Sequence, residues 1–146
     1  KALRFLESEQ VWQTRFLAPK EMVDGVYECR LLLRDRIGHT YEEKKSFVID
    51  SRPPTIQASF DRPTYRPGDT LEVRIQSDAD TRRIRLRVAS LEPTEAAWNA
   101  EWKASIGRIV LPNELATGQH VLEISAEDFA HNVSTQRVTF AVAGQR

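Results

Sequence analysis

Cysteine, histidine and long apolar runs are all scarce in this sequence. Its 146 residues include one cysteine, Cys29, and three histidines. A single cysteine cannot form an internal disulfide or a cysteine-based zinc site. No uninterrupted aliphatic run is longer than three residues, as in the leucines at 31–33, which is far short of the roughly 18 apolar residues that cross a bilayer. Charge interrupts the first residues before any apolar stretch develops, so we expect no signal peptide within this chain.

The chain has no excess charge of either sign. Its 21 lysines and arginines equal its 21 aspartates and glutamates. Binding to nucleic acid or to an anionic membrane depends on a basic surface, which this balance argues against. We therefore expect neither a nucleic-acid partner nor membrane insertion.

What the sequence has in abundance is alternation of apolar and polar residues. Residues 71–76 and 83–88 alternate strictly, which is typical of strands with one face on a core and the other in water. Residues 92–102 contain alanines that favour a short helix, with an irregular strand as the alternative. After residue 54 we predict seven strands, as many as in an immunoglobulin-type sandwich, near residues 55–60, 70–77, 82–90, 97–104, 106–111, 120–127 and 135–142.

An internal repeat organises the chain. A shift of 93 positions superposes Asp35 on Asp128 and Phe47 on Phe140, with matching parity of the apolar positions between them. Two prolines at 53–54 stiffen the junction between the copies.

The two copies differ in completeness. The second contains all seven predicted strands, whereas the first begins at what corresponds to the third strand, because Leu3 and Phe5 start an alternation like that of residues 84–88. We therefore predict an all-β fold of tandem immunoglobulin-like β-sandwiches. Residues 1–51 are expected to be the carboxyl-terminal part of a first domain, and residues 52–146 a complete second domain.

The turns and strand ends carry a family resemblance. Residues 24–38 and 47–54, and residues 117–132 of the second copy, resemble the bacterial Ig-like repeats found in tandem in large surface and periplasmic proteins. The resemblance implies a non-catalytic spacer or protein-interaction module of a larger extracytoplasmic bacterial protein. Its expected partners are other domains of the same polypeptide and another protein. A shorter resemblance, over residues 61–70, is to the start of macroglobulin-type domains.

The resemblance implies a structural role for two residues. Tyr27 occupies the position of a tyrosine whose hydroxyl ties the sixth strand of the sandwich to the preceding corner. His120 stands at the same position in the second copy. We interpret both as structural groups at a corner, because a histidine can donate one such hydrogen bond.

No catalytic constellation is evident. The sequence has no Gly-x-Ser-x-Gly elbow, phosphate loop or paired-histidine metal motif. His39 and His131 are expected in hairpin turns of separate copies, where they cannot converge on one site. The sequence therefore predicts that the protein is not an enzyme.

Calcium is the one metal hypothesis, and no other cofactor is expected. Some related repeats hold ions near the linker between modules, and Asp35, Asp50, Asp128 and Asn132 lie in loops near module ends. Calcium takes six to eight oxygen ligands, but the only Asp-x-Asp cluster in the sequence is at 78–80, in a turn of its own. Calcium bound at the linker or loops stays an alternative.

The basic run around residues 82–87 has a structural interpretation. Arg83, Arg85 and Arg87 share one face of a strand that is expected to pair with the sixth strand of its sandwich. The outward residues of that sixth strand are Glu123 and Glu127. Opposite charges across a strand pair attract each other, so we expect a self-neutralised, solvated sheet face.

Cysteine and tryptophan complete the candidate residues. Cys29 aligns with Leu122 on the inward parity of a strand, so we expect it to be buried. Trp98 and Trp102 are four residues apart and could present one face to a ligand. This gives the alternative function, a carbohydrate- or ligand-binding accessory domain. Against it, we expect at least one of the two indoles to fill the core.

Overall fold

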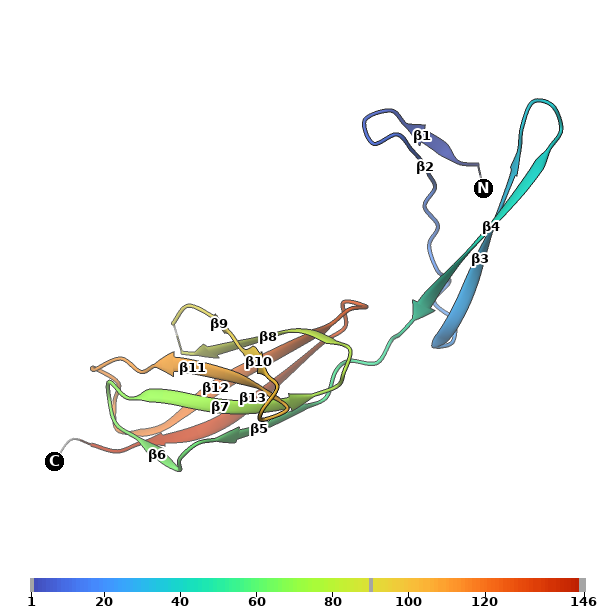
Figure 1. Ribbon diagram of the computed structural model, residues 1–146. Coiled ribbons are helices and arrows are strands. Elements are labelled where there is room, and N and C mark those ends of the chain that lie inside the picture. The colour runs from blue at the N-terminus through green and yellow to red at the C-terminus, as the bar shows by residue number, and fades with distance from the viewer. Residues whose placement is uncertain (1, 90, 145–146) are drawn as a thin grey trace. The chain divides into compact units, whose positions relative to one another are not determined.

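The computed structural model describes residues 2–89 and 91–144, and within them all regular structure is β-strand. The chain divides into two compact units, residues Lys1–Asp50 and Ser51–Arg146. Each unit forms its own sheets (Figure 1). No membrane-spanning helix is found among the described residues.

Two sheets build the second unit. One has four strands in the order β10-β11-β7-β5, and the other has five in the order β6-β13-β12-β8-β9. Neighbouring strands are antiparallel except for β6 and β13, which are parallel. The strands are β5 (Ile56–Phe60), β6 (Thr64–Tyr65), β7 (Thr70–Ser77), β8 (Thr81–Val88), β9 (Thr94–Glu95), β10 (Ala97–Asn99), β11 (Ala104–Val110), β12 (Gly118–Asp128) and β13 (Val133–Val142).

This strand order is that of an immunoglobulin-type sandwich. Lettered along the chain from A to G, with β6 and β9 as the additions A′ and C′, the sheets read D-E-B-A and A′-G-F-C-C′. The all-β, immunoglobulin-like part of the prediction is therefore confirmed for this unit.

Alternate residues of the strands fill the core between the two sheets. On β7, Leu71, Val73 and Ile75 are at most 1% exposed, while the residues between them face outward. At Gly107 on β11 the sheets approach so closely that a Cβ atom would lie 1.8 Å from a methyl carbon of Leu86. The thickness of the core is thus fixed by side chains of β8 and the bare backbone of β11.

An aromatic cluster closes one end of this core. The ring centroids of Tyr65, Phe60 and Phe140 are 6.0–6.3 Å apart. The hydroxyl of Tyr65, which is fully buried, donates a hydrogen bond to Asp61. Burial and this carboxylate raise the pKa of Tyr65, so the hydroxyl keeps its proton and its hydrogen bond.

The first unit consists of two separate hairpins. β1 (Arg4–Leu6) pairs with β2 (Val11–Gln13), and β3 (Gly25–Arg34) pairs with β4 (Thr40–Ile49). None of the described residues 2–50 is buried, because a two-stranded sheet covers neither of its own faces. The face expected to be apolar is half-buried or exposed at Leu3, Phe5, Leu31, Leu33, Phe47 and Ile49.

One prediction about the first unit is wrong, and another stays a prediction. The open one is that Leu3 and Phe5 begin a counterpart of β8: β8 pairs with both β9 and β12, and β1 pairs with β2. Cys29 is exposed rather than buried. Strand parity gives the face on which this thiol lies, but the two-stranded sheet has no second layer of its own to cover it.

The region from 89 to 104 differs in detail from the prediction. β8 ends at Val88, and residue 90 of the expected strand lies outside the described residues. Residues 92–102 form β9, β10 and turns rather than a helix. The strand expected at 97–104 is interrupted, because the side chain of Asn99 accepts the N–H of Trp102 at 3.1 Å and turns the chain.

We expect Phe140→Ala to destabilise the second unit by about 3–5 kcal/mol, because Phe140 is 3% exposed and packs on two other aromatic rings. Phe129→Ala is the matched control, since Phe129 is 70% exposed, and it should cost no more than about 0.5 kcal/mol. Urea denaturation followed by circular dichroism measures both. A loss under about 1 kcal/mol for Phe140→Ala would contradict the packing described.

Candidate functional site

The hairpins β3–β4 and β12–β13 end in turns of the same construction. In each, the N–H of an aspartate donates to the carbonyl four residues further on, at 2.9 Å from Asp35 to His39 and 3.1 Å from Asp128 to Asn132. The aspartate side chain accepts the N–H of that same residue at 2.8 Å in both turns. The two turns, which lie 93 residues apart in the sequence, thus have the same hydrogen bonds.

The opposite ends of these hairpins also correspond. The hydroxyl of Tyr27 donates to the carbonyl four residues upstream at 2.6 Å, and Nε2 of His120 contacts the carbonyl four residues upstream at 2.6 Å. A carbonyl can only accept, so His120 donates from Nε2. Tyr27 stacks on Phe47 at 5.7 Å, and His120 stacks on Phe140 at 5.8 Å. Each side chain thus bonds back to the carbonyl four residues before it, and the role of both residues as structural corners of a repeat stays a prediction.

Asp128 is the one buried charged side chain among the described residues. Burial alone would raise the pKa of its carboxyl. Hydrogen bonds from the side chain and backbone of Asn132 and from the N–H of Ala130 outweigh burial, so the pKa of Asp128 lies below its usual value. The ionised carboxylate of Asp128 therefore stabilises the turn through these hydrogen bonds.

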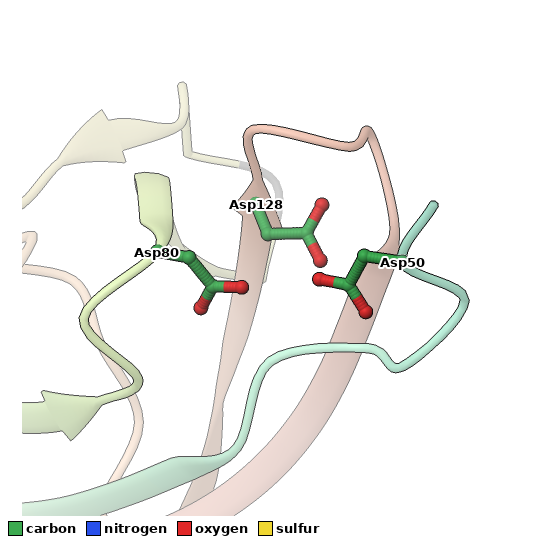
Figure 2. A group of neighbouring side chains, drawn as sticks. All are labelled: Asp50, Asp80 and Asp128. Atoms are coloured by element: carbon green, nitrogen blue, oxygen red, sulfur yellow. The ribbon is translucent and has the colours of Figure 1, made fainter. Parts of the chain in front are cut away.

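Asp80 and Asp128 approach each other at one end of the second unit (Figure 2). Their carboxylate oxygens lie within 4.8 Å. Asn132 is beside them and donates its amide to Asp128 at 3.0 Å. Asp50, which Figure 2 also draws, is the last residue of the first unit, and Asp35 lies in the β3–β4 turn. Of the four residues predicted for calcium, Asp128 and Asn132 thus share one turn of the second unit.

Sequence reasoning missed Asp80 as a member of this group. The acidic pair at 78–80 was the available signal, but its two carboxylates have different surroundings. Asp78 accepts the N–H and hydroxyl of Thr55 at 2.8 and 2.7 Å. Both oxygens of Asp128 already accept hydrogen bonds from Asn132, and calcium needs six to eight oxygens. Calcium binding stays a prediction.

Trp98 lines a cleft of about 670 Å³ between the two sheets of the second unit. On β10 it lies opposite Ser105, which in turn lies opposite core-facing Ile75. Ile75 and Ile84 provide apolar walls of the cleft. The indole is nevertheless 68% exposed, because β10 is a short strand at the edge of its sheet.

Trp102 lies on the other face of the same sheet. Its ring is 3.6 Å from the guanidinium carbon of Arg74, a residue that alternates on β7 with core-facing Val73 and Ile75. Trp102 is 50% exposed. The two indoles therefore do not line one face, and the prediction that at least one fills the core is wrong. Aliphatic side chains and the Tyr65 cluster fill it instead.

The basic face of β8 is neutralised by its neighbouring strands. Arg87 lies opposite Glu123 of β12 and donates to it at 3.0 Å. Glu95 of β9 lies 3.6 Å from both Arg83 and Arg85. The interpretation as a solvated, self-neutralised sheet face is confirmed, and such exposed pairs contribute little to stability.

Comparison with known proteins gives likeness in structure alone. No protein-family model matches the chain, and no curated protein matches it. Among solved structures, an amphioxus IgVJ-C2 molecule matches with a TM-score of 0.46 and 13% sequence identity over 81% of this chain. The chain covers 60% of that structure. The fold of the second unit is therefore assigned from its own strand order.

We expect Asp128→Asn to destabilise the second unit at pH 7 and to have a smaller effect at pH 3. A carboxyl whose pKa is lowered on folding stabilises the fold above its unfolded pKa of about 3.9, and this contribution is lost as the pH falls through the folded value. Urea denaturation at the two pH values measures the difference. Asn132→Ala removes the side-chain amide that donates to Asp128. It should therefore diminish the part of the unfolding free energy that depends on the ionisation of Asp128. An equal effect of Asp128→Asn at both pH values would contradict the role of the ionised carboxylate.

Proposed function

We propose that the chain is a non-catalytic spacer and protein-interaction module, built of immunoglobulin-like repeats, within a larger extracytoplasmic bacterial protein. The observation that carries this proposal is that the histidines and the buried aspartate, the residue types that catalysis most often uses, form local hydrogen bonds instead. His120 bonds to a corner carbonyl, His39 and His131 each bond to a carboxylate within four residues, and Asp128 holds a turn. Their hydrogen bonds maintain local backbone structure.

Tandem organisation is part of the proposal. It is supported by the matching turns at Asp35 and Asp128 and by the matching corners at Tyr27 and His120. Residues 1–50 would then be the carboxyl-terminal part of one repeat, and residues 51–146 the next. The extracytoplasmic and bacterial assignments rest on the resemblance of the turns to surface and periplasmic repeats.

A second candidate function is a carbohydrate- or ligand-binding accessory domain. The observation that favours it is the exposure of Trp98 beside a cleft, with Trp102 exposed on the other face. A sugar that protects Trp98 from acrylamide quenching, in a chain carrying Trp12→Phe and Trp102→Phe, would support this function. The reciprocal chain, which keeps Trp102 alone, is the matched control.

The spacer role is tested by exchange within the longer protein. We expect replacement of residues 51–146 by an unrelated sandwich of equal length to preserve the activity of the longer protein, and deletion of these residues to impair it. A spacer acts through its length and stiffness, so the surface of the replacement should be irrelevant. Tolerance of the deletion, or loss of activity on exchange, would contradict the spacer role.

A spacer module must also fold without its neighbours. We expect a fragment of residues 51–146 to unfold in one cooperative step, because it contains the whole two-sheet core. Its Tm should agree within about 4 °C with that of the same unit in the full chain, which corresponds to less than about 1 kcal/mol. Thermal scans of both proteins by circular dichroism measure this. A non-cooperative fragment would contradict an autonomous module.

A further inference from the structure

Arg74 contacts an aromatic ring, and no carboxylate among the described residues pairs with it. It lies on the outward face of β7, opposite Ser59 of β5 and Ile106 of β11. Glu72, two residues earlier on the same face, is bonded to Arg108 at 2.9 Å. Within the described part of the chain, Nε of Arg74 is the one buried side-chain nitrogen or oxygen without a hydrogen-bond partner. A buried donor of this kind needs a physical explanation.

The contact with Trp102 leaves the N–H groups of this guanidinium without an acceptor. The ring centroid of Trp102 lies 3.6 Å from the guanidinium carbon, and at this distance the two planar groups stack. The N–H bonds of a guanidinium lie in its plane, so a ring on its face accepts none of them. Removal of water from a cation without an acceptor in exchange is unfavourable. An anion beside the terminal nitrogens of Arg74 would offset this cost.

Arg74 and Trp102 line a hollow of about 450 Å³ in the second unit. This volume is within the range of small-molecule sites. Of the described residues that line the hollow, Arg74 is the only charged one. Gln57, Ser59 and Gln76 contribute amide and hydroxyl groups, and Gln57 lies opposite Gln76 on the neighbouring strand. Such groups both donate and accept hydrogen bonds.

These components together indicate one class of ligand. The two oxygens of a carboxylate match the fork of an arginine. Amide and hydroxyl side chains suit the hydroxyl groups of a sugar, and an indole offers an apolar surface to its C–H groups. A free inorganic anion would leave the indole and the amides unused, and a neutral sugar would leave the cation without a partner. The hollow therefore fits a sugar that carries a carboxylate.

We propose that this hollow binds a uronic acid, either free or as one unit of an acidic polysaccharide. Arg74 binds its carboxylate, Trp102 packs against its C–H groups, and the amides of Gln57 and Gln76 bond to its hydroxyl groups. The inference deepens the second candidate function and rests on it. It places the sugar at Trp102, on the face of the sheet away from the cleft beside Trp98.

The test uses the full chain and three methyl glycosides, those of glucuronic acid, of its methyl ester and of glucose, together with the same three in the galactose series. We expect the acid of at least one series to bind at least about tenfold more tightly than its ester and its neutral parent, because only the acid pairs with the guanidinium. NMR titration measures these affinities. The ester keeps the sugar and removes the charge, so this comparison needs no variant.

Indole N–H signals locate the bound sugar. The chain has three tryptophans, and Trp98→Phe and Trp102→Phe assign the two signals of interest. We expect the acid to shift the Trp102 signal and to leave the Trp98 signal unchanged. A shift at Trp98 alone would overturn the inference and keep the second candidate function. Absence of any indole shift with every sugar would contradict both.

Arg74→Gln is the decisive variant. It removes the charge and keeps an amide, so the acid, the ester and the neutral parent should bind equally weakly. Arg74→Lys keeps the charge without the planar fork and should retain part of the preference for the acid. Arg85→Gln is the matched control, because it makes the same change in net charge on β8, in the other sheet. It should retain the full preference.

Three outcomes would overturn the proposal. The first is equal affinity of the unmodified chain for the acid and its ester in both series. The second is a preference for the acid that survives in Arg74→Gln, since the arginine would then not select the ligand. The third is displacement of the acid by an equal or lower concentration of acetate or of a capped peptide with one glutamate, because a simple anion or an acidic peptide would then be the occupant.

Discussion

A β-hairpin covers neither of its faces and pairs only its inner edges, so a hairpin of two ten-residue strands needs further strands before it can be part of a stable domain. In the second unit, β8 pairs with the free edge of β12, and the four-stranded sheet packs on the inner face. The hairpin β3–β4 has the same turn and corner but only two strands. The contrast in burial between the units follows from this one requirement.

Strict alternation was enough to predict the long strands, because a period of two over eight residues, as in β7, is hard to produce by chance. The two-residue strands β6 and β9 carry no period and could not be predicted. Cys29 shows a second limit, since parity assigns a face without showing what covers it. Asp80 shows a third, because its approach to Asp128 depends on how the strands are joined rather than on spacing along the chain.

Electrostatics in this protein is organised by strand rather than by domain. A net charge of zero hides a regular arrangement in which Glu123 lies between arginines of two neighbouring strands. Each such pair is worth little in water. Together these ion pairs favour one register and one set of neighbouring strands. A strand with acidic residues beside β12 would set like charges opposite Glu123.

The parallel pairing of β6 with β13 has a mechanical consequence. β6 lies near the start of the second unit and β13 near its end, and Thr64 and Tyr65 pair with Ala141 and Val142 in the same chain direction. Tension along the polypeptide pulls one strand backward and the other forward, so their backbone hydrogen bonds are sheared together instead of being unzipped one after another. A force applied between β6 and β13 must therefore break these hydrogen bonds at the same time, and the sandwich resists unfolding more strongly in this direction.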